Sequence, residues 1–153
     1  MRLAGAHSNA AKHELAAEVV RQFGEARIKV TGTSMLPAVW PGDVLTVRRN
    51  EPSELLPGRI VLCHRDGRFF IHRLVGRRKD GVITRGDSLG FEDPAFRDDQ
   101  VLGEVVSIVR DGRPASLSPA WWHEAGSWMV RHSDLCERIF LRLRRLPKLL
   151  WVN

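Results

Sequence analysis

Ser34 is the residue whose surroundings best suit a nucleophile. It follows an expected strand and lies between Gly32 and Pro37. Such a turn can hold a hydroxyl outward beside unpaired backbone N–H groups, which is the geometry that a serine nucleophile with an oxyanion site requires. A serine beside glycine and proline is also common in structural turns, and His72 taken alone fits a histidine packed in a strand. Both interpretations stay open on these residues alone.

Five motifs resemble, in family order, those of the type I signal peptidases and the related self-cleaving repressors. They are Ser34–Pro37 with Pro41–Asp43, then Pro57–Val61, Phe70–Gly76, Ile83–Ser88 and Val101–Val106. The first resembles the nucleophile motif, the third the segment of the general base, and the fourth the family's Gly-Asp motif. The second departs from the family pattern, because Arg59 replaces the usual aspartate. Together they imply the signal-peptidase fold over about residues 28–109.

The resemblance places His72 at the position of the general base. Bacterial signal peptidases and the repressors usually have lysine there, whereas the endoplasmic-reticulum and archaeal branch has histidine. A histidine titrates near neutral pH without the desolvation that a lysine base needs, and a carboxylate can fix its tautomer. Asp87 and Asp93 match that branch. We expect Asp93 to orient His72 and Asp87 to support the site, with Glu92 as the alternative to Asp93.

The oxyanion donor is expected to be the backbone N–H of Ser34. Some members of the family add a hydroxyl two residues before the nucleophile, where this chain has Gly32, so a second donor is not assigned. Thr33 lies nearby, and the direction of its side chain stays open. Met35 is expected to line the substrate groove or to pack beneath it.

The remaining sulfur and imidazole groups have simpler interpretations. Cys63, His64 and His72 lack a recognised zinc spacing, so no metal site is expected, and nothing in the sequence requires a cofactor. Cys63 could serve as a thiol nucleophile with His72, but the family pattern does not support this. A structural role for Cys63 is favoured.

Two kinds of element must position these groups. Apolar residues at helical spacing predict a helix over residues 9–23, capped by Ser8 and ended by Gly24. Alternating apolar segments between turn signals predict strands, and the Asp66-Gly67 pair is the strongest hairpin signal. The expected strands are Ile28–Thr31, Val44–Arg48, Arg59–His64, Arg68–Val75, Val82–Arg85 and Val101–Val109.

The expected fold is mainly β: a small, irregular, β-barrel-like signal-peptidase fold with an N-terminal helix and C-terminal helices. The division is residues 1–25 for the helix, 26–112 for the catalytic domain and 113–153 for a basic helical extension. In that extension, apolar residues from Leu135 to Leu146 form a stripe beside several arginines. We expect the stripe to pack on the β domain, with contact to an anionic membrane surface as the alternative.

Composition excludes several classes of protein. The 153 residues carry a net charge of +6, are 43% hydrophobic and include two cysteines. Disorder and a disulfide framework are therefore not expected. No apolar segment approaches the roughly 20 residues that span a bilayer, which predicts a cytoplasmic protein, peripheral on a membrane at most. The basic charge suits acidic partners, but nucleic acid is not the expected one.

The resemblance implies a serine endopeptidase that cleaves a protein or peptide precursor. It also implies a preference for small residues just before the cut, in a segment bound as an added strand. An autoprotease of the repressor kind, cut at Ala4-Gly5 for example, is one alternative. A catalytically silent relative that binds peptide, membrane or nucleic acid is another.

Overall fold

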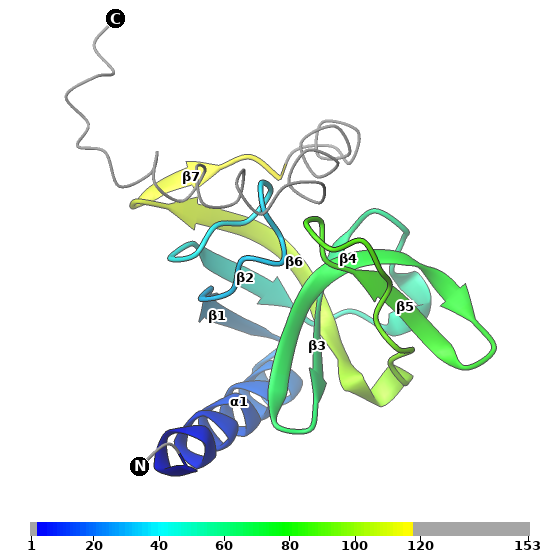
Figure 1. Cartoon of the computed structure of the whole chain (residues 1–153), viewed down its shortest axis with the longest axis horizontal. Helices are drawn as coiled ribbons and strands as arrows, with labels where there is room; N and C mark the ends of the chain where they lie inside the picture. The colour runs from blue at the N-terminus through cyan, green and yellow to red at the C-terminus, as the bar shows by residue number, and fades with distance from the viewer. Residues whose placement is uncertain (1–2, 118–153) are drawn as a thin grey trace, which may run out of the picture.

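The computed structural model describes the backbone of residues 3–117 and the side chains of residues 11–117 (Figure 1). One helix, α1 (Leu3–Phe23), precedes the strands. These are β1 (Glu25–Lys29), β2 (Val44–Arg48), β3 (Ile60–Arg65), β4 (Arg68–Arg78), β5 (Gly81–Arg85), β6 (Val101–Arg110) and β7 (Arg113–Ala115). Two short 3-10 helices, Pro52–Glu54 and Asp98–Gln100, lie in the connections before β3 and β6.

The strands form one antiparallel sheet in the order β1-β2-β6-β3-β4-β5, and β7 adds to β6. The mainly β expectation is confirmed, but the sheet is not a closed barrel. It is open because its two end strands, β1 and β5, do not pair with each other in the described part of the chain. In addition, β5 pairs with β4 only from Arg73 to Arg78. The first half of β4 instead faces a groove, on whose other side lie β1 and the residues that follow it.

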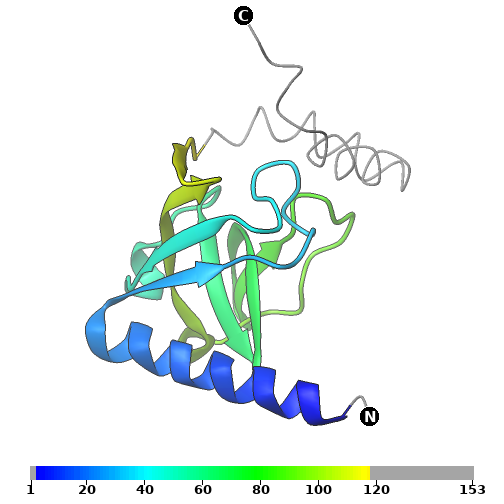
Figure 2. The ribbon, with the colours of Figure 1, turned by 90° about the vertical axis from the view of Figure 1, so that its left-hand side faces the viewer.

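Helix α1 is longer than the sequence predicted. It begins at Leu3, so Ser8 lies inside the helix and is not its N-cap. Gly24 ends it as expected: its φ of 76° suits glycine, and its N–H donates to Val20 O at 3.0 Å. In Figure 2 the helix lies along one end of the sheet.

The apolar residues that predicted helix α1 are only in part buried. Ala17 and Val20 are fully buried against the sheet, whereas Leu15 and Phe23 are 69% and 76% exposed. The helix therefore contacts the sheet through its small residues, because a short side chain lets the helix lie close to β1 and β6.

The predicted strands are present with shifted ends. Only β2 has the predicted bounds, and the Asp66-Gly67 turn between β3 and β4 has the positive φ values, 52° and 69°, that its sequence predicts. The sequence did not predict β7, which starts after the Asp111-Gly112 turn, inside the range that was expected to be the helical extension. The predicted C-terminal helices lie outside the described residues.

Two clusters of buried residues hold the sheet together. The larger joins α1 to β1, β2, β3 and β6 around Val20, Leu45, Leu62 and Val105. The smaller lies around Phe96, between β3, β4 and β5. In the part of the chain that the structure describes, no helix combines the length and apolar character needed to span a membrane.

Replacing Gly103 with alanine is expected to lower the free energy of unfolding by about 1–3 kcal/mol. A Cβ at Gly103 in β6 would overlap the carbonyl group of Arg48 in β2, so the two strands would have to separate. Equilibrium denaturation followed by circular dichroism measures the change. Gly76→Ala is the control, because a Cβ there meets no atom within 4 Å; equal losses in both variants would contradict the prediction.

Candidate active site

Ser34 lies in the loop between β1 and β2, and the segment after β5 holds this loop in place. Ser88 N donates to Ser34 O at 2.9 Å, and Ser88 Oγ donates to Thr33 O at 3.1 Å. Gly86 lies so close that a Cβ on it would be 2.6 Å from Ser34 O. The Gly-Asp motif therefore packs directly against the backbone of Ser34, and the carbonyl of Thr33 is used in that contact.

A buried carboxylate organises the far end of the same loop. Asp43 is fully buried, and its Oδ2 accepts a hydrogen bond from Trp40 N at 2.8 Å. Arg110 of β6 donates to both oxygens of Asp43, at 3.0 and 2.8 Å, and to Ala38 O at 3.2 Å. The Ser34 loop is thus held by the 86–88 segment near Ser34 and by β6 at its far end.

Ser34, His72 and Asp93 form a continuous chain of hydrogen bonds. His72 Nδ1 lies 2.6 Å from Asp93 Oδ2, and His72 Nε2 lies 2.9 Å from Ser34 Oγ. A carboxylate only accepts, so Nδ1 carries the proton and Nε2 accepts the hydroxyl hydrogen of Ser34. His72 and Asp93 are 6% and 9% exposed, so little water competes for these bonds.

Thr84 completes the surroundings of the Asp93 carboxylate. Its Oγ1 donates to Asp93 Oδ2 at 2.5 Å, and Asp93 N donates to Thr84 O at 2.8 Å. Burial alone would raise the pKa of Asp93, but the hydrogen bonds from His72 and Thr84, with the charges of His72 and Arg65, hold that pKa below its ordinary value. Asp93 is therefore ionised at neutral pH.

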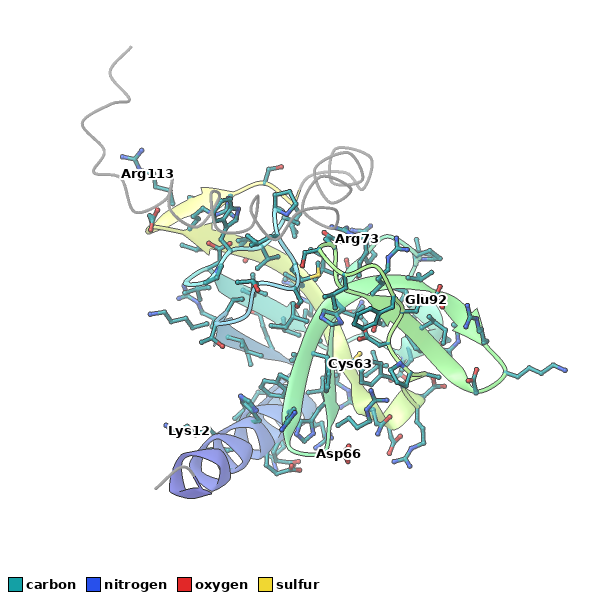
Figure 3. All side chains as sticks on the ribbon, in the orientation of Figure 1. Lys12, Cys63, Asp66, Arg73, Glu92 and Arg113 are labelled. Atoms are coloured by element: carbon teal, nitrogen blue, oxygen red, sulfur yellow. The ribbon has the colours of Figure 1, made fainter. Side chains whose placement is uncertain are left out.

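The two other candidate carboxylates lie elsewhere. Asp87 forms a buried, two-pronged ion pair with Arg73, whose Nε and Nη2 donate at 2.8 and 2.6 Å. Glu92 accepts from Arg78 at 2.8 Å on the surface. Arg73 and Glu92 lie apart along the β4 and β5 region in Figure 3. Of the three carboxylates, Asp93 is the one that meets His72, whereas Asp87 lies between Gly86 and Ser88, the two residues that contact the Ser34 loop.

A groove of about 450 Å³ opens beside Ser34 and His72. One wall is Ile28–Gly32 and the other is Phe69–His72, with Met35 beneath. Met35 is 3% exposed and also packs in the larger core cluster, so it both lines the groove and supports it. The walls are largely apolar, which suits an extended peptide with apolar side chains.

His13 of α1 also lines this groove, and the sequence gave no reason to select it. Its Nδ1 donates to Gly67 O at 3.0 Å, and its ring stacks on Phe69 with 4.6 Å between centroids. The only sequence signal was a polar residue one turn from the buried Ala17. The helix therefore fastens the tip of the β3–β4 hairpin at one end of the groove.

Cys63 lies on β3 inside the smaller core cluster. Burial, together with the charge of Asp93, raises the pKa of its thiol to about 12 despite the opposing charge of Arg65. The thiol is protonated at neutral pH, which disfavours the alternative of a cysteine nucleophile. Among residues 11–117, no three His, Cys, Asp or Glu side chains gather closely enough to hold a metal ion.

The family model for Peptidase S24-like proteins matches residues 4–106, more than half of the chain. The chain belongs to this family. The match covers the Ser34 loop, His72 and Asp93, and it confirms the resemblance at the level of the superfamily that holds signal peptidases and self-cleaving repressors. Comparison with curated proteins found no significant match. S24-like proteins include serine peptidases as well as self-cleaving repressors.

Proposed function

We propose that this S24-like protein is a serine endopeptidase in which Ser34 is the nucleophile, His72 the general base and Asp93 the residue that orients the base. The observation that carries the proposal is the chain of two hydrogen bonds from Ser34 through His72 to Asp93, of 2.9 and 2.6 Å, at the side of a groove. A histidine at the position of the base supports, as part of this proposal, a relation to the endoplasmic-reticulum and archaeal branch of the superfamily.

Acylation begins when Ser34 Oγ attacks the peptide carbonyl and its proton passes to His72 Nε2. The imidazolium that forms is stabilised by the carboxylate of Asp93, already ionised and fixed by Thr84. His72 then protonates the leaving amine, and the C–N bond breaks to give an acyl-enzyme. The backbone N–H of Ser34 stabilises the oxyanion; a second donor is not assigned.

Deacylation uses the same residues, with water in the place of Ser34 as the nucleophile. His72 Nε2 takes a proton from water, and the hydroxide formed attacks the ester carbonyl. The Ser34 oxygen leaves with the proton from His72, which restores the hydrogen-bonded chain. No cofactor takes part in either step.

The substrate class is an extended segment of a protein precursor. Residues Phe69 and Ile71 border the groove where β4 has β3 as its strand neighbour and β5 has not yet joined. A peptide laid in the groove can add to this strand edge by backbone hydrogen bonds. A preference for small residues before the cut follows from the family resemblance. A cytoplasmic location is part of the same proposal, with attachment of the basic C-terminal segment to an anionic membrane surface as the alternative to its packing on the β domain.

Self-cleavage at Ala4-Gly5 is less well supported. Both residues belong to α1, and a peptidase of this kind needs its substrate extended. The helix would have to unwind before that bond entered the groove. A silent, binding-only relative is likewise disfavoured, because such a protein has no need for the Ser34–His72–Asp93 chain.

Reaction with an activated aryl ester, followed by intact-protein mass spectrometry, tests the proposal. We expect one acyl group per chain, mapped to Ser34, with a rate that rises from pH 5 to 9 because only a neutral imidazole accepts the serine proton. Ser34→Ala serves as the blank. Equal acylation of wild type and Ser34→Ala at every pH, or none of the wild type, would favour the binding-only relative.

A further inference from the structure

Arg65, the last residue of β3, lies against the segment that carries Asp93. Its Nη1 donates to Pro94 O and to Ala95 O, both at 3.2 Å. Its guanidinium carbon lies 4.1 Å from the centroid of the Phe96 ring. One side chain from the β3–β4 hairpin thus contacts all three residues that follow Asp93.

These carbonyl contacts are made by the two residues of the segment that lie between its backbone hydrogen bonds to β5. Asp93 N donates to Thr84 O at 2.8 Å, and Phe96 pairs with Val82 through two backbone hydrogen bonds of 2.8 and 2.9 Å. Between them lie two residues, of which Pro94 has no N–H to donate. Arg65 supplies donors to the two carbonyls in this interval, so it fixes the backbone directly beside Asp93.

The same guanidinium also approaches His72 through two aromatic rings. Arg65 lies 5.4 Å from the centroid of Phe70, whose ring is 5.3 Å from that of Phe96 and 6.2 Å, edge-on, from that of His72. Arg65 therefore packs against Phe96 and Phe70, and Phe70 in turn lies edge-on to His72. Arg65 is not among the residues that line the groove in the described part of the chain.

We propose that Arg65 is a positioning residue for Asp93: it holds the 93–96 segment so that the carboxylate meets His72 Nδ1. The expected effect of Arg65 on the acylation rate rests on the proposed function, whereas its expected effect on the His72–Asp93 hydrogen bond does not. Arginine suits the task because the two N–H groups of one terminal nitrogen, Nη1, can donate to the two carbonyls while the planar guanidinium lies over the Phe96 ring. Lysine keeps the charge and can donate from Nζ, but it has no planar face to stack on the ring.

Two variants and a matched control test the inference. Arg65→Met removes the charge and the donors, and Arg65→Lys keeps a charged donor but removes the planar guanidinium. Arg68→Met makes the same charge change as Arg65→Met at the exposed residue directly opposite Arg65 in the hairpin. The first readout is the low-field proton NMR signal of His72 Nδ1–H, which reports the hydrogen bond to Asp93 without requiring activity. The second is the rate of Ser34 acylation by the aryl ester at neutral pH.

We expect the low-field signal to be lost or broadened in both Arg65 variants and kept in Arg68→Met. The acylation rate should fall about 10- to 100-fold in Arg65→Met, as for a misplaced catalytic group, and less in Arg65→Lys. An unchanged signal in both Arg65 variants, or a signal lost equally in Arg68→Met, would overturn the inference. Wild type that keeps the signal yet does not acylate would refute the proposed function alone.

Discussion

Replacing Asp93 with asparagine is expected to lower the rate of Ser34 acylation by about 10³- to 10⁴-fold. Asparagine has nearly the same shape, so Thr84 and the 93–96 segment should keep their places. Its amide can, however, present an N–H to His72 Nδ1, which then must accept. The proton moves to Nε2, and the serine hydroxyl loses its acceptor. Stopped-flow release of the phenol from an activated aryl ester measures the rate.

Two other carboxylates provide comparisons for this variant. Glu92→Gln should acylate within about twofold of wild type, because Glu92 pairs with Arg78 on the surface and surface pairs contribute little. Asp87→Asn should have a smaller effect than Asp93→Asn, since Asp87 acts on the loop and not on the base. If Asp93→Asn and Glu92→Gln lose the same activity, the assignment of Asp93 to His72 fails.

The sequence could nominate these carboxylates but could not distinguish them. His72 and Arg73 are neighbours on β4, so their side chains point to opposite faces of the sheet. Asp93 meets the first and Asp87 the second. Which carboxylate reaches which face depends on the path of the chain between β5 and β6, and that path has no periodic pattern to read.

The strands were easier to predict than the contacts made by side chains on the connections between strands. Turn chemistry at Asp66-Gly67 and at Asp80-Gly81 marks strand ends locally, which is why the positions of these strands along the chain could be read from the sequence. The start of α1 could not, because the helix continues through Ala4 and Ala6, good helix formers that outweigh the capping signal of Ser8.

The partial pairing of β4 with β5 could not be predicted from the sequence either, for a related reason. The strands between Ile60 and Arg78 are apolar or alternate between apolar and polar residues. This pattern is the same whether a strand has neighbours on both sides or on one side. That β5 joins β4 only from Arg73 onward depends on pairing across the sheet. The supporting roles of Thr84, Arg65 and His13 rest on such long-range contacts too, although a threonine in the apolar strand Val82–Thr84 was a usable signal.

Replacing Arg73 with methionine is expected to lower the free energy of unfolding by about 3–5 kcal/mol. Asp87 is 7% exposed, and the variant would leave its charge buried without a counter-charge. The carbonyl of Gly58, which accepts from Arg73 Nη1 at 2.7 Å, would lose a donor as well. Equilibrium denaturation at neutral pH, followed by circular dichroism, measures the change.

A double variant separates the cost of an unpaired charge from the value of the pair. Arg73→Met with Asp87→Leu removes both charges, so it should recover at least half of the lost stability. Arg77→Met is the surface control: Arg77 pairs with Asp98 at 2.7 Å, but both side chains are well exposed, and the expected loss is below about 1 kcal/mol. If Arg73→Met lowers the free energy of unfolding no more than Arg77→Met does, the buried charge of Asp87 does not need Arg73 as its counter-charge. The Gly86–Ser88 contact with Ser34 would then need another support. If the double variant is stable yet acylates slowly, the ion pair serves chiefly to place the nucleophile loop.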